Sequence, residues 1–366
     1  MLKIGLFSMP VHLPDRILAD ALQEDRELVI LADQLGFSEA WMGEHFTSVG
    51  EPIPSPLIFN ASLVDAAPNI MFGSGVICLP QQHPAVVAAH VALLDQLSRG
   101  RVIFGIGSGG LSSDWEIFDN LDHPARGRAM VESIDAILRL WQEEPPIRHK
   151  GETWQFAIED YVIPEIGVGQ MIRPYQTPHP QIAISLRGPR SGLARLAGGR
   201  GWIPLSGNFI PEADVATHWP TYVDEAEKLG TPIDLDIWRV GRSVLITETS
   251  QQAKDIINDP NGVFTDYYYY LNTHRKLAEG SASGPHDEQS ERAEAMELAK
   301  ELVILGTEDE VLNQLVAFHD VVGHFGTLMI TGHDVSDDPE LWRTSMTTLA
   351  KNVAPKLGQY MKTSLK

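Results

Sequence analysis

One segment, residues 78–107, limits the folds open to this chain more than any other: CLPQQHPAVVAAHVALLDQLSRGRVIFGIG. It begins at the end of an apolar run, and Pro80 and Pro84 bound the polar turn that follows. Residues 85–97 carry apolar side chains at helical spacing, and a Ser-Arg-Gly stop separates them from a second apolar run at 101–106. Because parallel strands need such a crossover, the segment predicts one βαβ unit.

The same unit recurs along the chain. Strands are expected at residues 3–8, 38–42, 70–79, 101–106, 181–186, 201–205, 237–247 and 325–330. Helices are expected at residues 17–35, 58–65, 85–97, 125–141, 189–197, 211–229, 250–257, 307–322 and 339–357. Eight right-handed strand–helix steps close a ring, so the pattern predicts an α/β fold, a (β/α)8 TIM barrel with insertions.

The expected barrel is a single domain over residues 1–366, with two interruptions. Residues 143–180 are rich in proline and glycine and predict an irregular excursion before the fifth strand. Residues 259–301 predict an insertion after the seventh strand, and its polar tract 281–291 is expected to be mobile. Residues 111–122 are not expected to continue as a helix.

Composition excludes several classes of protein. With 28 basic and 49 acidic residues the formal charge is −21, which argues against nucleic acid or an anionic membrane as the main partner. Cys78 is the single cysteine, so neither an intramolecular disulfide nor a cysteine-rich metal site is expected. The first ten residues lack the pattern of a signal peptide, and no apolar run is long enough to span a membrane. A cytoplasmic location is therefore expected.

In a barrel of this type, function lies at the carboxyl ends of the strands. The expected ends carry Phe7-Ser8-Met9, Gly43-Glu44-His45, Cys78-Leu79-Pro80, Gly107-Ser108-Gly109, Leu186-Arg187-Gly188, Ser206-Gly207-Asn208 and Thr331-Gly332-His333. None of these ends has a lysine, which weighs against a Schiff-base enzyme. The first strand has no His-x-His, which weighs against a metal-dependent hydrolase, and no metal site is predicted.

His45 is the residue at these ends best suited to proton chemistry. A histidine titrates near neutral pH, so His45 can accept a proton or stabilise an oxyanion-like intermediate. The alternative is a structural histidine with its hydrogen bonds satisfied. Asp95 and Arg101 are expected to pair beneath the barrel.

Two glycine-containing loops predict ligand contacts. Residues 105–110, GIGSGG, match the G-x-G-x-x-G string, but they follow the fourth strand and not the first, so they do not predict a dinucleotide site. They favour a loop where the backbone approaches a flat ligand, with a plain tight turn as the alternative. Residues 187–191, RGPRS, open a helix and predict an anion site at its amino terminus; the alternative is an ordinary helix cap with solvated arginines.

Four consecutive tyrosines, residues 267–270, lie in the insertion. A helix there presents aromatic surface on several sides, so part of it is expected to cover a pocket. The alternative, packing of the insertion on the barrel, is expected for at least two of the four.

Several segments together resemble one family. Residues 36–50, GFSEAWMGEHFTSVG, residues 79–111, and residues 182–202, IAISLRGPRSGLARLAGGRGW, are similar to the bacterial luciferase-like, flavin-dependent monooxygenases. GTEDEVLNQL at 306–315 extends the similarity over nearly the whole chain. The resemblance implies an eight-stranded α/β barrel, usually a homodimer through its second and third helices. It also implies reduced FMN as cofactor, O₂ as co-substrate, a flavin peroxide and insertion of one oxygen atom into the substrate.

The resemblance also implies roles by position. His45 matches the catalytic histidine beside the reactive flavin edge, and the Gly75-Val76 bond matches a place where a non-proline cis peptide often lies under the flavin. The residues expected to contact the cofactor are Glu44, Gly75, Val76, Gly107, Ser108, Arg187, Gly188, Arg190 and Ser191. The luciferases proper have Cys-Arg at the Gly107-Ser108 position, so the phosphate falls to residues 187–191 here and aldehyde-dependent light emission is not expected. Residues 259–301 match a mobile lid that shields the flavin intermediate.

The resemblance and the aromatic content together predict an apolar substrate, such as a terpene, a cyclic ketone or an aliphatic compound. Phe7, Met9, Trp115 and Tyr268 are the residues expected to contact it. Epoxidation and Baeyer–Villiger oxidation both fit. No second nucleotide fingerprint is present, so a separate NAD(P)H:flavin reductase is expected to supply the reduced flavin. The alternatives are a deazaflavin-dependent hydride-transfer enzyme of the same fold and a catalytically silent flavin-binding protein.

Overall fold

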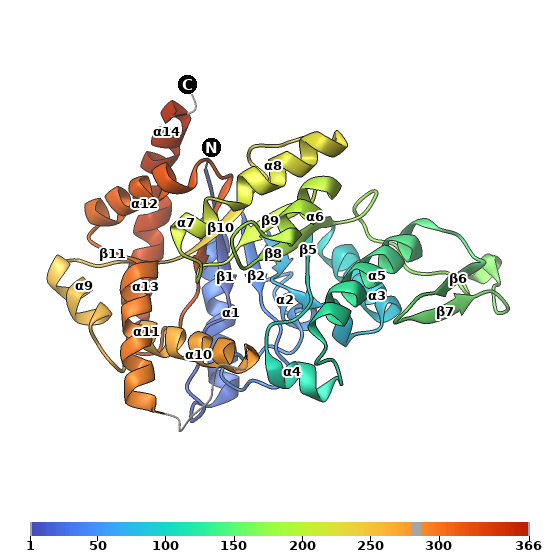
Figure 1. Cartoon of the computed structure of the whole chain (residues 1–366), viewed down its shortest axis with the longest axis horizontal. Coiled ribbons are helices and arrows are strands. Elements are labelled where there is room, and N and C mark those ends of the chain that lie inside the picture. Colours follow the sequence, from blue (N-terminus) through green and yellow to red (C-terminus); the bar gives the residue numbers. More distant parts are fainter. Residues whose placement is uncertain (1, 280–286, 365–366) are drawn as a thin grey trace.

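The eight expected strands form a closed ring in the computed structural model, which describes residues 2–279 and 287–364 (Figure 1). Each strand pairs in parallel with its neighbour, and β12 returns to β1, so the predicted TIM barrel is confirmed. In ring order the strands are β1 (Lys3–Ser8), β2 (Glu39–Met42), β3 (Met71–Ser74), β5 (Val102–Gly107), β8 (Gln181–Leu186), β9 (Ile203–Ser206), β10 (Arg239–Ile246) and β12 (Thr327–Thr331).

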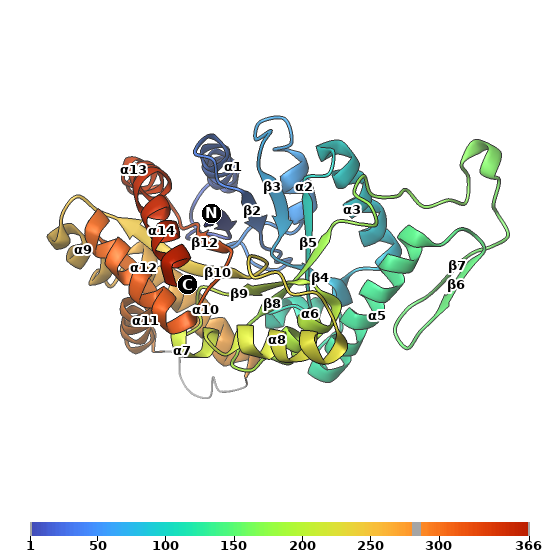
Figure 2. The same ribbon diagram turned by 90° about the horizontal axis from the view of Figure 1, so that it is seen from above.

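Helices surround the ring on its outside (Figure 2). They are α1 (Leu18–Gln34), α2 (Pro56–Ala61), α3 (Pro84–Ser98), α5 (His123–Gln142), α6 (Gly192–Arg200), α8 (His218–Leu229), α12 (Glu308–Val322) and α13 (Pro339–Thr348). Apolar side chains fill the space between strands and helices in two large clusters, one under α1, α2 and α12 and the other under α3, α5, α6 and α8. Strands covered in this way are apolar on both faces. None of the described helices is both long and apolar enough to cross a membrane.

A smaller apolar cluster, which includes Trp41 and Met329, fills the inside of the ring. Gly73 makes room for the indole, because a Cβ atom there would lie 2.3 Å from the Trp41 ring. At the amino-terminal end of the ring, the guanidinium of Arg239 donates to the carboxylate of Glu39 over 3.0 and 3.1 Å. The barrel is therefore closed and packed at this end, and only the opposite end is available for ligands.

Several expected boundaries are wrong. The third strand is interrupted after β3 by a cis peptide bond between Gly75 and Val76, and β4 (Ile77–Cys78) and the 3₁₀ turn η1 (Leu79–Gln81) follow. The resemblance predicted a cis bond at this position, and that prediction is confirmed. The sixth expected helix is split into α7 (Glu212–Val215) and α8. The closing helix continues past α13 through a π turn, η3 (Leu349–Val353), into α14 (Ala354–Ser364).

Residues 111–122 were not expected to form a helix, and this expectation is wrong, because α4 (Ser112–Ile117) lies there. This six-residue helix begins with Ser112, Ser113 and Asp114, which are residue types typical of a helix start. The expected ion pair between Asp95 and Arg101 is also wrong. Asp95 accepts two hydrogen bonds from Gln176, and Arg101 donates to main-chain carbonyls in the turn 64–70.

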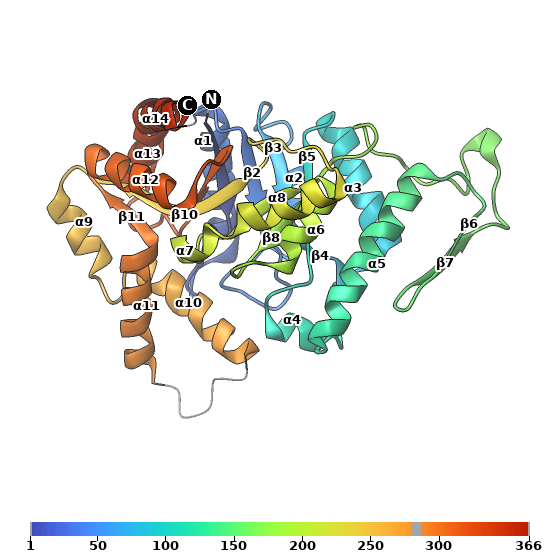
Figure 3. The same cartoon turned by 45° about the horizontal axis from the view of Figure 1, so that its top comes forward.

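Two segments lie outside the ring. Residues 143–180 contain an antiparallel hairpin, β6 (Ile147–Lys150) and β7 (Gln155–Ile158), and the 3₁₀ turn η2 (Pro164–Ile166), and they extend away from the barrel (Figure 2). After α9 (Ser250–Ile257), the insertion forms α10 (Val263–Ala278) and α11 (Glu288–Leu302), and β11 (Val303–Gly306) then pairs with β10. Part of the polar tract 281–291 lies outside the described residues. Helices α10 and α4 lie at the same end of the barrel (Figure 3).

Candidate active site

The imidazole of His45 lies between two buried carboxylates at the carboxyl end of the barrel. His45 follows β2, and its Nδ1 is 3.1 Å from Asp114 Oδ2 on α4. Its Nε2 is 3.2 Å from Glu51 Oε2, an ion-pair contact without the angle of a hydrogen bond. The side chains of Glu51 and Asp114 are only 3% and 1% exposed. The ring is therefore held between the two carboxylates, Asp114 at Nδ1 and Glu51 at Nε2.

Asp114 organises the loop that carries His45. Its Oδ1 accepts hydrogen bonds from the backbone N–H groups of Phe46 and Thr47 at 3.1 and 2.8 Å, and from the Thr47 hydroxyl at 2.5 Å. Burial raises the pKa of Asp114, but hydrogen bonds from His45 and Thr47 outweigh burial and hold the pKa below its ordinary value. Asp114 is therefore a permanent carboxylate beside the histidine. Asp114 was not predicted as a site residue because no helix was expected at residues 111–122.

The two carboxylates determine the charge of His45. Burial lowers the pKa of His45, but the hydrogen bond to Asp114 and the ion pair with Glu51 outweigh burial and raise the pKa to about 9. At neutral pH the ring is an imidazolium. Of the two roles that the sequence left open, the structure favours stabilisation of negative charge over proton acceptance.

Glu44 ties the same loop to the floor of the site. Its carboxylate accepts hydrogen bonds from the backbone N–H of Cys78 at 2.8 Å and from Gln82 at 2.9 Å. Burial raises the pKa of Glu44 to about 7 in spite of these bonds. Cys78 itself is buried. Glu44 thus fixes the turn that follows the cis bond.

The floor of the site is formed by backbone and glycine. A Cβ atom on Gly75 would lie 2.6 Å from the Phe7 ring, and one on Gly107 would lie 2.5 Å from Val76. A side chain on either glycine would displace Phe7 or Val76, so the two glycines let these side chains pack closely against the backbone beside Ser108. A flat ring system fits such a floor. Phe7 lies against it, in keeping with a ligand-contacting position.

Arg187 lies at the end of β8 and faces the glycine loop. Its guanidinium donates to the carbonyl of Gly109 at 3.0 Å and lies 2.6 Å from the position of a Cβ atom on Gly110. Part of the Arg187 side chain is exposed to solvent. Protein surrounds the rest, and this burial lowers the pKa of the guanidinium. An arginine remains charged under such conditions, so the site contains a cation that a ligand phosphate can reach.

The remaining residues of the expected anion site surround the start of α6. This helix begins at Gly192, three residues later than expected, and the hydroxyl of Ser191 caps it by accepting from the N–H of Leu193. The carbonyl of Gly188 accepts from His218, and Arg190 is exposed. The structure brings these residues to one loop beside Arg187.

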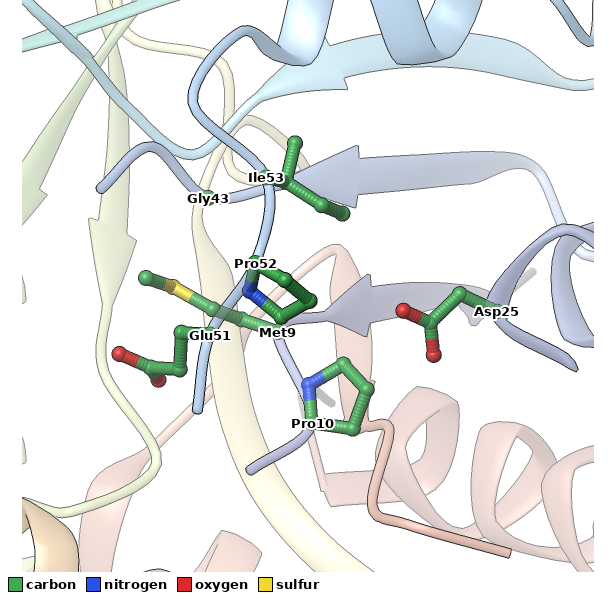
Figure 4. A pocket seen from close by; sticks show the side chains of 7 residues that line it. All are labelled: Met9, Pro10, Asp25, Gly43, Glu51, Pro52 and Ile53. Atoms are coloured by element: carbon green, nitrogen blue, oxygen red, sulfur yellow. The ribbon is translucent and has the colours of Figure 1, made fainter. Parts of the chain in front are cut away.

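The expected substrate contacts divide into two groups. Met9 packs over Gly43 and belongs to a narrow pocket with Glu51 that is too tight for a water molecule (Figure 4). Trp115 is buried under the guanidinium of Arg126, 3.7 Å from its ring centre. Tyr268 is also buried, in an apolar cluster between α10 and the barrel. Trp115 and Tyr268 therefore pack within the protein, and Met9 lies next to the histidine loop.

Helix α10 contributes two residues that the sequence analysis did not single out. Tyr270 donates from its hydroxyl to Ser48 Oγ at 2.9 Å. His274 lies one turn later, and its Nδ1 is buried without a hydrogen-bond partner among the residues that the structure describes. Tyr267 and Tyr268 pack on the barrel, which confirms that at least two of the four tyrosines serve packing. The sequence feature that could have identified Tyr270 and His274 is their helical spacing, since residues four apart share one face of a helix.

No group of three or more described metal-ligating side chains is arranged to hold a metal ion.

Comparisons with known proteins agree with this geometry. Residues 2–324 match the family model described as luciferase-like monooxygenase. The chain is 30% identical over 360 residues to the 4-hydroxyprotoasukamycin monooxygenase of Streptomyces nodosus subsp. asukaensis, covering 97% of this chain and 92% of that protein. It is also 30% identical to the limonene 1,2-monooxygenase of Rhodococcus erythropolis, covering 96% and 85%. The oxygenating constituent of 3,6-diketocamphane monooxygenase from Pseudomonas putida, a type II Baeyer–Villiger monooxygenase solved with FMN, superposes with a TM-score of 0.82 at 25% identity, covering 97% and 98%.

The charge on His45 predicts a pH dependence of stability. Because the pKa of His45 is raised from 6.5 to about 9, its stabilising effect is fully present below pH 6.5 and is lost as pH rises through about 9. We expect the free energy of unfolding to fall across this window in the wild-type protein. His45→Gln should reduce that fall by up to about 1.4 kcal/mol per pH unit. Urea unfolding at several pH values measures both slopes, and equal slopes would contradict the assigned charge.

Proposed function

Because the chain belongs to the luciferase-like monooxygenase family, we propose that it uses reduced FMN and O₂ to insert one oxygen atom into an apolar small molecule. The observation that carries the proposal is the His45 imidazolium, held by Asp114 and Glu51 beside a floor of glycine and backbone. A reduced flavin bound on that floor supplies the electrons that activate O₂.

The residues present fit FMN. The ring system would lie over Gly75, Val76, Gly107 and Ser108, where the two glycines let Phe7 and Val76 pack closely. The phosphate would lie by Arg187, whose charge is already in the site, with Gly188, Arg190 and Ser191 on the adjoining loop. Glu44 supports the floor from below through Cys78.

The chain's own residues perform three tasks. The His45 imidazolium would stabilise an oxygen that gains negative charge, and its orientation is already fixed before that charge develops. Asp114 and Glu51 keep the ring protonated at neutral pH. Helix α10 covers the site and keeps water out of it.

The substrate class rests on the relatives and on the residues near the floor. One relative is named for limonene and another for a diketocamphane, both apolar ring compounds. Phe7 and Met9 present an aromatic and a thioether side chain near His45's loop. A terpene, a cyclic ketone or an aliphatic compound fits this environment.

A separate NAD(P)H:flavin reductase supplies the reduced flavin in this proposal. One relative is named as the oxygenase component of a flavin-dependent monooxygenase, which implies a partner of this kind. The cytoplasmic location remains a prediction. A deazaflavin-dependent enzyme and a silent flavin-binding protein remain the alternatives that experiment must exclude.

We further propose a homodimer formed through α2 and α3. Apolar side chains on one face of α3 are exposed, namely Val86, Leu93 and Leu97, and Ile58 on the neighbouring α2 is 76% exposed. A second copy of the chain, presenting the same face about a twofold axis, would bury these side chains.

The catalytic proposal predicts oxygen transfer. The protein is mixed with a generic NADH:FMN reductase, FMN, ¹⁸O₂ and limonene, camphor or a long-chain aldehyde in turn. We expect at least one product to gain a single ¹⁸O atom, and His45→Gln to lower its yield by about 10²-fold or more. Release of all reducing equivalents as hydrogen peroxide with every substrate would contradict the proposal. Turnover with a reduced deazaflavin without O₂ would favour the alternative enzyme.

The phosphate assignment predicts a selective loss of affinity. Arg187→Ala removes a charge-assisted contact, so FMN binding should weaken by about 10- to 100-fold while riboflavin binding changes little. Arg195→Ala, which removes an exposed arginine from α6, is the control. Flavin fluorescence titration measures both ligands. An equal loss for FMN and riboflavin would show that Arg187 does not bind the phosphate.

The dimer proposal predicts dissociation by one charge. Leu93→Glu places a carboxylate in the proposed interface and should give a monomer in sedimentation velocity. Leu229→Glu, at a side chain on α8 that is 61% exposed, should leave the dimer intact. A monomeric wild-type protein, or a dimeric Leu93→Glu variant, would disprove this interface.

A further inference from the structure

Helix α10 makes direct contact with the loop that carries His45. The Tyr270 hydroxyl donates to Ser48 Oγ at 2.9 Å. Its ring packs over Gly50, where a Cβ atom would lie 3.6 Å from the ring carbon Cε2. The opposite side of this loop is bound to Asp114 through Phe46 and Thr47, so the loop is held between α4 and α10.

The Ser48 hydroxyl connects Tyr270 to the histidine. Ser48 Oγ also accepts from the backbone N–H of Glu51 at 3.1 Å, which folds residues 48–51 into a tight turn. The turn directs the Glu51 carboxylate to within 3.2 Å of His45 Nε2. The Tyr270 hydroxyl also lies beside that carboxylate. The direction of the Glu51 carboxylate therefore depends on this turn, on the imidazolium and on the neighbouring Tyr270 hydroxyl.

We propose that Tyr270 is a positioning residue: through Ser48 it holds Glu51 against His45, so that the charge on His45 depends on α10 being in place. The inference rests on the proposed function, in which that charge is used. It adds a physical connection between the covering helix and the histidine. With α10 displaced, Glu51 would be free to turn to water, and only Asp114 would still hold the ring.

The groups facing His45 are consistent with this role. They are Asp114 from α4, Glu44 and Glu51 from the loop after β2, and His274 from α10, with the Tyr270 hydroxyl beside Glu51 and Arg187 near His274. Burial and the nearby Glu51 raise the pKa of Tyr270, so its hydroxyl remains a hydrogen-bond donor. Burial lowers the pKa of His274 to about 4, so that ring is neutral at pH 7. Tyr270 and His274 of α10 are therefore both neutral, and neither places a charge beside the ion pairs of His45 with Asp114 and Glu51.

A single hydroxyl deletion tests the proposal. Tyr270→Phe keeps the ring over Gly50 and removes the hydroxyl that donates to Ser48 and lies beside Glu51. Tyr269→Phe is the matched control, because that neighbouring ring lies under Arg292, with the guanidinium carbon 4.9 Å from its centre. The first readout uses protein without flavin: the pKa of His45, from the histidine ring carbon signals in NMR, assigned with His45→Gln.

We expect Tyr270→Phe to lower the pKa of His45 by about one unit or more, because the second carboxylate is no longer held in place. Ser48→Ala should cause a shift of similar size, and the double variant should add little to either, since the two groups act in series. Tyr269→Phe should leave the pKa of His45 unchanged. A pKa of His45 that is the same in the wild type and in Tyr270→Phe would overturn the inference.

The second readout separates this inference from the proposed function. With FMN, reductase and substrate, Tyr270→Phe should lower the product formed per NADH at least threefold and shift the pH at which product formation falls toward lower values, while the KM for substrate stays close to the wild-type value. Loss of product with an unchanged pH profile would reduce Tyr270 to a packing residue. If the wild type forms no product at all, the proposed function fails, whereas the pKa measurement still decides whether Tyr270 positions Glu51.

Discussion

The carboxylate of Asp114 is the group on which the rest of the site depends. Its two oxygens accept from the backbone of Phe46 and Thr47, from the Thr47 hydroxyl and from the His45 ring. These bonds fix the loop after β2 and keep His45 protonated. A buried carboxylate satisfied in this way stays ionised, and a permanent negative charge next to an imidazole makes it an imidazolium. Asp114 therefore contributes to both the orientation and the charge of His45, and Glu51 adds to the charge.

The barrel brings that cation to the ligand. Parallel strands that close a ring place all their carboxyl ends at one rim, so α4, the loop after β2 and the end of β8 meet although they are far apart in sequence. Glycines at positions 75 and 107 let the Phe7 and Val76 side chains pack closely on the floor of this rim. Arg187 and His45 then provide two positive charges at separate positions on the rim. The arrangement matches a ligand that is flat, electron-rich at one edge and anionic at its tail.

The sequence predicted the barrel well because each βαβ unit is local. The spacing of apolar residues and the turn residues within about thirty positions are enough to identify one βαβ unit. Eight such units determine the fold. His45, Gly75 and Arg187 were found because they lie at strand ends. Asp114, Glu51 and Tyr270 were missed because their roles arise from contacts between distant segments, which no local pattern records. Tyr268 was chosen over Tyr270 for the same reason, since a run of four tyrosines does not reveal which face of the helix meets the loop.

We propose that a flavin binds on the Gly75–Val76 floor with its reactive edge at the His45 imidazolium and its phosphate at Arg187. A crystal structure of the protein with FMN would test this placement. We expect the ring system over residues 75–76 and 107–108, the His45 ring at the flavin edge, and an ion pair between Arg187 and the phosphate. A flavin bound away from this floor, or a His45 ring facing away from the cofactor, would show that the placement is wrong.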